Sequence, residues 1–254
     1  MAAYRDQGIV LRGKPYRDHD SLVTLFLVNH GKVAAIGRGV RKPKSSLNAG
    51  LYPLSYSGFE LYRGRSTLES VTGADVIHGF GKIRADLDRI GWATLVAEVV
   101  DECFSDHDPA PEAFYILVAG LEALNEGRHP PSAAMAAIWQ LLRAAGFVAR
   151  FDQCPQCGVA VDGALAWGPG AREPVCLECV RTKRAKILSV GVVKTVNRWL
   201  MMPAEKFGSV EVRGRLVQEM VDWLSLTMSS QLHRTPRAFG FVSQLLEQEV
   251  EEPR

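Results

Sequence analysis

The sequence predicts a multidomain α+β protein, in which an N-terminal five-stranded β-barrel is followed by an α-helical domain that carries an inserted four-cysteine module. Three observations support this prediction. Short hydrophobic runs separated by turn residues fill residues 4–78. Apolar residues at helical spacing begin at about residue 82. Four of the five cysteines form two C-x2-C pairs. We therefore expect domains at 1–80 and at 81–150 with 183–254, and the module at 151–182.

The N-terminal strands are separated by clear turn signals. His30-Gly31 makes a tight turn, and Arg63-Gly64 is a second turn. The expected strands are residues 8–11, 21–28, 32–36, 54–62 and 67–77. Five short strands in one small domain favour a closed barrel, because closure removes exposed strand edges. The OB-fold is the five-stranded barrel of this kind, so we expect an OB-fold in residues 1–80.

Helical periodicity starts after the barrel and resumes after the cysteines. Apolar residues recur at i, i+3, i+4 and i+7 through 92–103 and 114–124. We expect Gly127 to end the second helix, Ser132 to cap the third and Ser189 to cap the first helix after the module. No Gly/Ser-rich linker separates the two helical blocks, so they are expected to share one core.

The composition is that of an ordinary globular protein of 254 residues. No run approaches the roughly 18 apolar residues that a membrane-spanning helix needs, and the N-terminus has no secretory pattern. We therefore expect a protein of the reducing cytoplasm, without a membrane partner. The net charge is +2, yet residues 1–80 hold eleven Lys/Arg against six Asp/Glu. That excess of +5 in the barrel hints at a polyanionic partner.

The two cysteine pairs predict a zinc site. Cys154-Pro-Gln-Cys157 and Cys176-Leu-Glu-Cys179 have the spacing of a zinc ribbon. Four protein thiolates complete the tetrahedral shell of Zn²⁺ and leave no position for water, so the site is expected to be structural. A redox motif requires only one C-x-x-C, and disulfides are rare in the cytoplasm. One structural Zn²⁺ is therefore the expected cofactor.

Basic residues follow the cysteines, and two interpretations of them stay open. They include Arg181, Lys183 and Arg184. These cations could contact phosphate groups of a nucleic acid. Alternatively, they could offset the negative charge of the metal site, since Zn²⁺ with four thiolates carries a formal charge of about −2.

A basic loop between two expected strands is the main candidate for binding nucleic acid. Its cations and hydroxyl are Arg38, Arg41, Lys42, Lys44 and Ser45. Such side chains neutralise phosphates or donate hydrogen bonds to them. Cations at expected strand ends could extend the patch: Arg12, Lys14, Arg17, Arg63 and Arg65. Tyr52 and Tyr56 are candidates for stacking on bases. The alternative is a solvated loop that happens to be basic.

Motifs for catalysis are missing from the sequence. It contains no phosphate-binding P-loop, no H-E-x-x-H and no G-x-S-x-G. Asp18-His19-Asp20 falls in an expected turn and is best explained as a polar turn. We therefore expect a protein that is not an enzyme.

The order of these parts, with several short segments, resembles the RecO family of bacterial recombinational-repair proteins. The similar segments are Gly8-Ile-Val-Leu11, Ser21-Leu-Val-Thr-Leu-Phe26 with His30-Gly31-Lys32-Val33, Gly37-Arg-Gly-Val-Arg41 with Lys44-Ser45, Leu61-Tyr-Arg-Gly64 and Leu141-Leu-Arg-Ala-Ala-Gly-Phe147. The resemblance extends over nearly the whole chain. It departs at Tyr16-Arg-Asp-His-Asp20, where the family has a Gly-Glu type of turn, so contacts of Arg17 or His19 with phosphate are not carried over.

The resemblance implies an OB-fold, a helical bundle and, in some members, a four-cysteine zinc module. It further implies a cytoplasmic, nucleoid-associated protein that binds single- and double-stranded DNA and anneals complementary strands. Such proteins act with RecR, sometimes with RecF, and with the acidic C-terminal tail of the single-stranded-DNA-binding protein, and they help to load RecA. Two alternatives remain: an adaptor that docks partner proteins and has incidental DNA affinity, and a zinc-ribbon protein that binds RNA.

Overall fold

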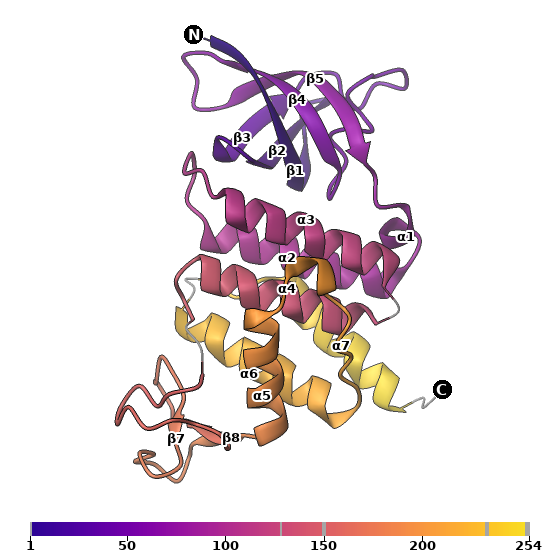
Figure 1. Ribbon diagram of the computed structural model, residues 1–254. Coiled ribbons are helices and arrows are strands. Elements are labelled where there is room, and N and C mark those ends of the chain that lie inside the picture. The colour runs from indigo at the N-terminus through magenta and orange to yellow at the C-terminus, as the bar shows by residue number, and fades with distance from the viewer. Residues whose placement is uncertain (1, 128, 149–150, 232–233, 252–254) are drawn as a thin grey trace.

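The computed structural model describes residues 2–127, 129–148, 151–231 and 234–251. Figure 1 shows three parts in series: the barrel at one end, the helices below it, and the cysteine-bearing segment at the opposite end. The chain begins at the barrel and ends among the helices. This arrangement places the most basic part of the sequence and the expected metal site at opposite ends of the molecule.

The first 80 residues form a closed barrel with the strand order β1-β2-β3-β5-β4. Its strands are β1 (Ala2–Tyr16), β2 (Asp20–Leu27), β3 (Gly31–Gly37), β4 (Tyr56–Arg63) and β5 (Glu69–His78). All neighbours are antiparallel except β3 and β5, which run parallel over three residue pairs. This order, with one short parallel closure, is that of the OB-fold. The predicted five-stranded barrel is confirmed, although β1 is much longer than the predicted run at 8–11.

The barrel has its own small core, and the long β3–β4 connection helps to close it. Val10, Leu25 and Phe59 are buried inside the barrel, as alternation along the strands requires. Val40 and Leu51 of the connection pack into the same cluster. The basic loop is therefore tied to the barrel by apolar residues at both of its ends.

Apolar residues on the outside of the barrel join it to the helices. Ile9, Leu11, Phe26 and Leu54 belong to the same buried cluster as the helical core. Beside them, Lys32 Nζ lies 3.3 Å from a carboxylate oxygen of Asp101 in the helical domain. Burial of this apolar area stabilises the junction, so the barrel and the helices form one continuous body.

The helices fall into two blocks separated by the cysteine-bearing segment. They are α1 (Gly81–Arg84), α2 (Leu87–Cys103), α3 (Pro111–Glu126), α4 (Pro130–Ala144), α5 (Val190–Met201), the short η1 (Ala204–Lys206), α6 (Arg215–Gln231) and α7 (Ala238–Glu251). Figure 1 shows α2 and α3 directly below the barrel and α5–α7 beyond α4. Among the described residues, no helix is both long and apolar enough to cross a bilayer.

The helix caps agree with the sequence in part. Ser189 is the N-cap of α5, and its side chain accepts a hydrogen bond from the backbone N–H of Val192. The prediction for Ser132 was wrong, because His129 is the N-cap of α4. Two prolines occupy the first turn of α4, where a missing N–H costs least. Ser132 is buried inside the helix, and its hydroxyl oxygen accepts from the N–H of Val212 at 2.9 Å.

Both helical blocks contribute to one core. The indole rings of Trp139 (α4) and Trp223 (α6) lie 4.9 Å apart, centroid to centroid, and the ring of Phe151 packs on both. The inserted segment forms a three-stranded sheet in the order β7-β6-β8. Its strands are β6 (Leu165–Trp167), β7 (Val175–Cys176) and β8 (Lys186–Leu188), so this sheet continues past residue 182 as far as α5.

Candidate nucleic-acid interface and metal centre

Backbone hydrogen bonds fix the basic loop to the turn between β1 and β2. The carboxylate of Asp20 accepts from the N–H of Gly39 at 2.8 Å. The carbonyl of His19 accepts from the N–H of Arg41 at 2.9 Å. These contacts hold the loop in a series of turns, so the cations of the turn and of the loop lie side by side.

The turn and the loop enclose a hollow of about 420 Å³. Three of the predicted cations line it: Arg17, Arg38 and Lys42. Its other side chains come from Asp18, His19 and Asp20. Arg17 has a left-handed backbone with a φ of 52°, and its guanidinium lies 5.2 Å from the ring centroid of Tyr16. The hollow is thus a small surface on which three cations converge.

All four cations of the loop are accessible to solvent, whether or not they line the hollow. Arg38, Arg41, Lys42 and Lys44 are all exposed. Within the described part of the chain, none of them forms an ion pair. Ser45 Oγ accepts from the N–H of Leu47 at 3.4 Å, which leaves its O–H as a donor. These groups are free to meet phosphate oxygens without first breaking an internal salt bridge.

Other predicted cations lie apart from this group. Lys14 is exposed on β1, close to the β1–β2 turn. Arg12 Nε donates to Asp101 of α2 at 2.7 Å, which commits it to the junction. Arg63 Nε donates to Glu69 at 2.7 Å, and this hydrogen bond raises the pKa of Arg63. Arg65 is exposed in the β4–β5 loop. The structure therefore does not gather all of the predicted barrel residues into one patch.

The two tyrosines considered for stacking have different environments. Tyr56 donates to the side chain of Gln7 at 2.6 Å and packs edge-on against Phe114 of α3. It belongs to the junction between the barrel and the helices. Tyr52 is 52% exposed, and the guanidinium of Arg84 lies 4.3 Å from its ring centroid. Of these two residues, only Tyr52 presents a ring at the surface.

The four cysteines of the inserted segment meet at one point. The sulfur atoms of Cys154, Cys157, Cys176 and Cys179 all lie within 4.8 Å of one another. The Cys157–Cys176 separation is 3.8 Å, which is far beyond a disulfide bond. Tetrahedral Zn²⁺ with Zn–S bonds of about 2.3 Å has sulfur–sulfur edges of about 3.8 Å. The arrangement has the dimensions of a tetrathiolate metal site.

The pKa values of these thiols are also those expected of a metal-binding cluster. Desolvation raises the pKa of Cys154, but backbone N–H groups of Cys176, Cys157 and Gln156 outweigh it and lower the pKa to about 6. Contacts with the sulfurs of Cys157 and Cys176, followed by desolvation, raise the pKa of Cys179 to about 12. The sulfurs therefore share protons through hydrogen bonds, and a metal ion at their centre would displace those protons.

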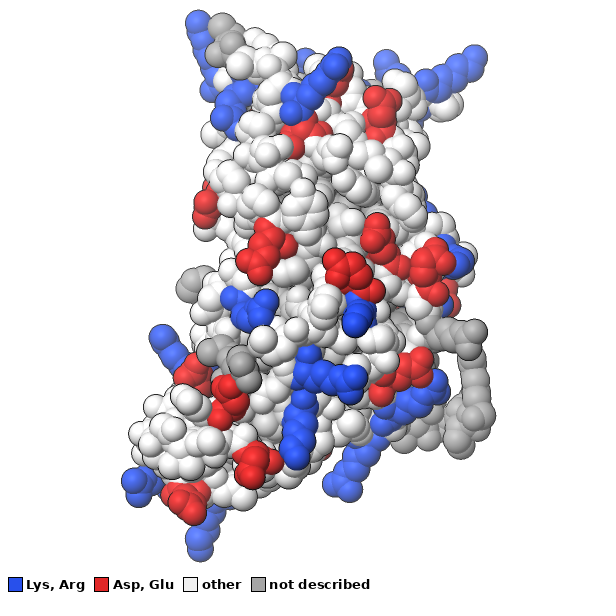
Figure 2. Space-filling model, in the orientation of Figure 1, with Lys and Arg blue, Asp and Glu red and all other residues white. Residues whose placement is uncertain are grey.

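The cations of the inserted segment are remote from the barrel. Arg181, Lys183 and Arg184 are exposed in the connection between β7 and β8. Figure 2 shows basic side chains projecting from the barrel end and from the lower part of the molecule, with acidic side chains both between these parts and within them. The predicted cations thus lie at both ends of the molecule.

The part that Asp20 plays was missed from the sequence. Its carboxylate fixes Gly39 at the start of the basic loop, whereas the sequence suggested only a polar turn. An acidic residue nineteen positions before its partner gives no local signal of such a contact. Its placement follows from the β2–β3 hairpin, which pairs Ser21 with Gly37 and so returns the chain to Asp20.

Comparisons with known proteins match both halves of the chain. The family "Recombination protein O N terminal" matches residues 1–80, and "Recombination protein O C terminal" matches residues 84–238. A DNA repair protein RecO from Anaeromyxobacter sp. (strain K) is 37% identical over 174 residues, which cover 68% of each chain. The RecO protein of Moorella thermoacetica is 30% identical over 95% of this chain and 91% of its own length.

A third relative, the RecO protein of Heliobacterium modesticaldum, is 30% identical over 100% of this chain and 94% of its own length. The strand order of the barrel, the helical domain behind it and the clustered cysteines agree with these matches. This chain belongs to the RecO family.

Proposed function

We propose that this chain binds single- and double-stranded DNA through the basic hollow of its barrel and anneals complementary strands. The observation that carries the proposal is the convergence of Arg17, Arg38 and Lys42 on one hollow, with Arg41 and Lys44 exposed beside it. OB-folds bind oligonucleotides with a strand face and the connecting loops of the barrel. The names of the relatives, DNA repair protein RecO, and of the family, Recombination protein O, support a role in recombinational repair. We place this role in the cytoplasm.

Annealing requires no acid, base or nucleophile. Two strands repel each other through their phosphates, and cations placed between the strands lower that repulsion. Phosphate contacts carry no sequence information, so the bases stay free to pair. Arg38, Arg41 and Lys42 supply these contacts, and the exposed ring of Tyr52 supplies a surface for an unpaired base.

Charge reversal in the loop tests the DNA-binding proposal. Arg41→Glu with Lys42→Glu should weaken binding to every single strand and lower the slope of log K against log salt by about 1 for each phosphate that is no longer neutralised. Lys194→Glu is the control, since Lys194 is exposed on α5, away from the barrel. Fluorescence anisotropy over a salt series measures both quantities. An unchanged slope in the double variant contradicts the proposal.

We propose that the four-cysteine site holds one structural Zn²⁺. Cys154, Cys157, Cys176 and Cys179 would bind it, and the ion would brace the inserted sheet against the helical core. Cys154→Ala should release the metal and lower the free energy of unfolding by at least about 2 kcal/mol. Cys103→Ala is the matched control, because Cys103 lies in α2 outside the cluster. Metal quantification and urea unfolding separate the two variants; a Cys154→Ala variant that keeps its metal contradicts the assignment.

We further propose that the chain acts with RecR, with the acidic tail of the single-stranded-DNA-binding protein and, in some settings, with RecF, to help load RecA. Membership of the RecO family supports these partners. The test is an annealing assay on DNA coated with the single-strand-binding protein. Removal of that protein's acidic tail should abolish the annealing of coated strands and leave the annealing of bare strands intact. Equal rates with and without the tail contradict this partnership.

A further inference from the structure

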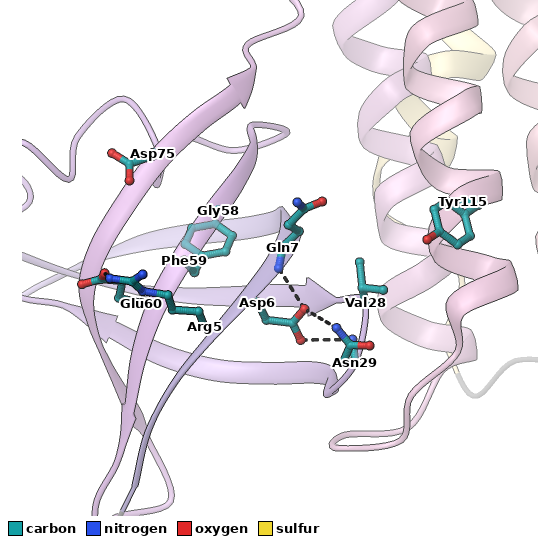
Figure 3. A pocket seen from close by; sticks show the side chains of 10 residues that line it. All are labelled: Arg5, Asp6, Gln7, Val28, Asn29, Gly58, Phe59, Glu60, Asp75 and Tyr115. Atoms are coloured by element: carbon teal, nitrogen blue, oxygen red, sulfur yellow. Dashed lines mark hydrogen bonds and ion pairs between the residues drawn. The ribbon is translucent and has the colours of Figure 1, made fainter.

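A second hollow lies where the barrel meets α3, away from the basic loop. It has a volume of about 520 Å³. Figure 3 shows its lining, with Asp75 of β5 at one end, Tyr115 of α3 at the other, and Gln7 between them. Val28 and Asn29, just after β2, also line it, whereas the basic hollow adjoins the start of β2. The two hollows therefore lie at opposite ends of β2.

The second hollow is a groove, and its floor, at Gly58, is backbone without a side chain. In the sheet, Gly58 of β4 lies directly between Gln7 of β1 and Asp75 of β5. A Cβ placed on Gly58 would meet only the carbonyl oxygen of Asp75, at 4.0 Å. The strand thus leaves space above Gly58 for an extended ligand to lie flat on the sheet.

The wall beside Asn29 is rigid. The buried carboxylate of Asp6 accepts from the N–H of Gln7 at 2.8 Å and from the N–H and Nδ2 of Asn29, both at 3.0 Å. The ring Nδ1 of His30 lies 2.6 Å from the same carboxylate. Because these contacts hold Gln7 and Asn29 in place, this wall of the groove is formed before any ligand arrives.

The lining is acidic. Asp6, Glu60 and Asp75 line the groove. Arg5 is the one Lys or Arg among the described lining residues, and it pairs with Glu60. Among the residues that the structure describes, the carboxylate of Asp75 has neither a hydrogen bond nor an ion pair, and Asp75 is exposed. Tyr115 is 63% exposed. Such a surface repels phosphates and attracts cations. The exposed ring of Tyr115 favours a planar cation, which can stack on it.

We propose that this groove is the docking site for an extended, arginine-bearing segment of a partner protein. One guanidinium pairs with the free carboxylate of Asp75, and another lies on the ring of Tyr115. Arginine is favoured over lysine, since its planar group both stacks on rings and binds a carboxylate with two hydrogen bonds. This surface is distinct from the DNA-binding loop and does not depend on the function proposed for that loop.

The test uses the full chain, labelled with ¹⁵N, and a capped heptapeptide of alternating arginine and serine. Saturable shifts are expected at the amides of Gly58, Asp75 and Tyr115. The glutamate–serine peptide of equal length should give none, and the lysine–serine peptide should bind more weakly. A single-stranded oligonucleotide should leave these three amides unshifted.

Variants assign the binding to the groove. Asp75→Asn should raise the Kd about five-fold, the factor that corresponds to about 1 kcal/mol, whereas Asp162→Asn, on the exposed surface of the cysteine-bearing segment, should not change it. Tyr115→Ala should weaken binding and Tyr115→Phe should retain it. Thermal unfolding confirms that each variant is folded. The proposal is overturned if the groove amides do not shift, if the two aspartate variants bind alike, or if the oligonucleotide shifts the same amides.

Discussion

Glu69 shows how one buried charge organises its neighbours at the rim of the barrel. The residue is 2% exposed. Its carboxylate accepts from the hydroxyl of Tyr4 at 2.5 Å and from Arg63 Nε at 2.7 Å. Burial, followed by the hydrogen bond and the negative charge of Glu69, raises the pKa of Tyr4 far above its usual value of 10.0. The protein therefore resists loss of the tyrosine proton.

This pKa predicts a loss of stability at high pH. The unfolded chain releases the Tyr4 proton near pH 10, whereas the folded chain retains it, so the contribution of Tyr4 to stability is fully present below that pH and is lost as the pH rises further. Cys103 acts in the same direction, because burial raises the pKa of its thiol from 9.0 to about 12. Urea midpoints at about pH 8 and about pH 11 should differ less in Tyr4→Phe than in the parent chain.

Tyr52→Phe is the control, since Tyr52 is half exposed. It should show the same alkaline loss as the parent chain. If Tyr4→Phe and Tyr52→Phe behave alike, the Glu69 contact does not couple the tyrosine proton to folding.

Side chains were predictable where the signal was local. The spacing of the four cysteines alone predicts their cluster, because each pair lies on one short turn. The contact between Tyr4 and Glu69 spans 65 positions and gives no such signal. Arg12 and Arg63 were predicted to bind DNA only as cations at strand ends. The sequence contains no sign of the carboxylates that the fold brings to them.

At the scale of elements, the turn between β2 and β3 lies directly against the helical domain. Gly31 has a φ of +66°, and a Cβ on it would lie 2.2 Å from the carbonyl oxygen of Asp108. The connection between α2 and α3 therefore rests directly on this turn. Only glycine satisfies both the left-handed backbone and the close approach.

Gly31→Ala should accordingly lower the free energy of unfolding by at least about 2 kcal/mol, through backbone strain and overlap with Asp108. Gly146→Ala separates the two causes, because Gly146 has a φ of +78° with nothing within 4 Å of its added Cβ. That variant should lose only about 1 kcal/mol. Equal losses in urea unfolding would mean that the contact with Asp108 contributes nothing.

Strands and helices could be predicted because apolar residues recur with a different period in each. All five strands and the helices at 92–103 and 114–124 lie where the sequence placed them. Their ends were less certain. The outer half of β1 pairs with β4 through polar and small residues, which carry no apolar run to detect. Ser132 was a poorer choice of cap than His129 because two prolines already fix the first turn of α4.

At the scale of the whole molecule, the predicted DNA-binding cations lie at opposite ends, on the barrel and on the cysteine-bearing segment. Two interpretations of Arg181, Lys183 and Arg184 remain distinct: contact with a second strand, or compensation for the charge of the metal site. If these cations contact phosphates, they would serve annealing but would not be needed for binding a single strand at the barrel.

Reversal of these three cations decides between the interpretations. If they hold a second strand, the triple Glu variant should keep its single-strand affinity, keep its metal and anneal several-fold more slowly. If they only compensate the thiolates, the variant should lose metal instead. Arg172→Glu, an exposed change on the same segment, is the control. Anisotropy, metal content and annealing rate are measured on one preparation.

The global arrangement was the least predictable level. The order of the parts could be read from the sequence, but nothing in it indicated that the cysteine-bearing segment lies at the far end from the barrel. The acidic groove was also missed, because Asp75, Gly58 and Tyr115 come from three elements and share no motif.

The shared core has an optical consequence. All five tryptophans, at 92, 139, 167, 199 and 223, follow the barrel, whereas five of the six tyrosines lie within residues 1–80. The indoles of Trp139, Trp199 and Trp223 are buried without a hydrogen-bond acceptor among the described residues, so their emission reports a dry interior. Ile9, Leu11 and Phe26 of the barrel belong to the same core as the helices. The fluorescence of the tyrosines and that of the tryptophans should therefore change together on unfolding, in a single cooperative transition.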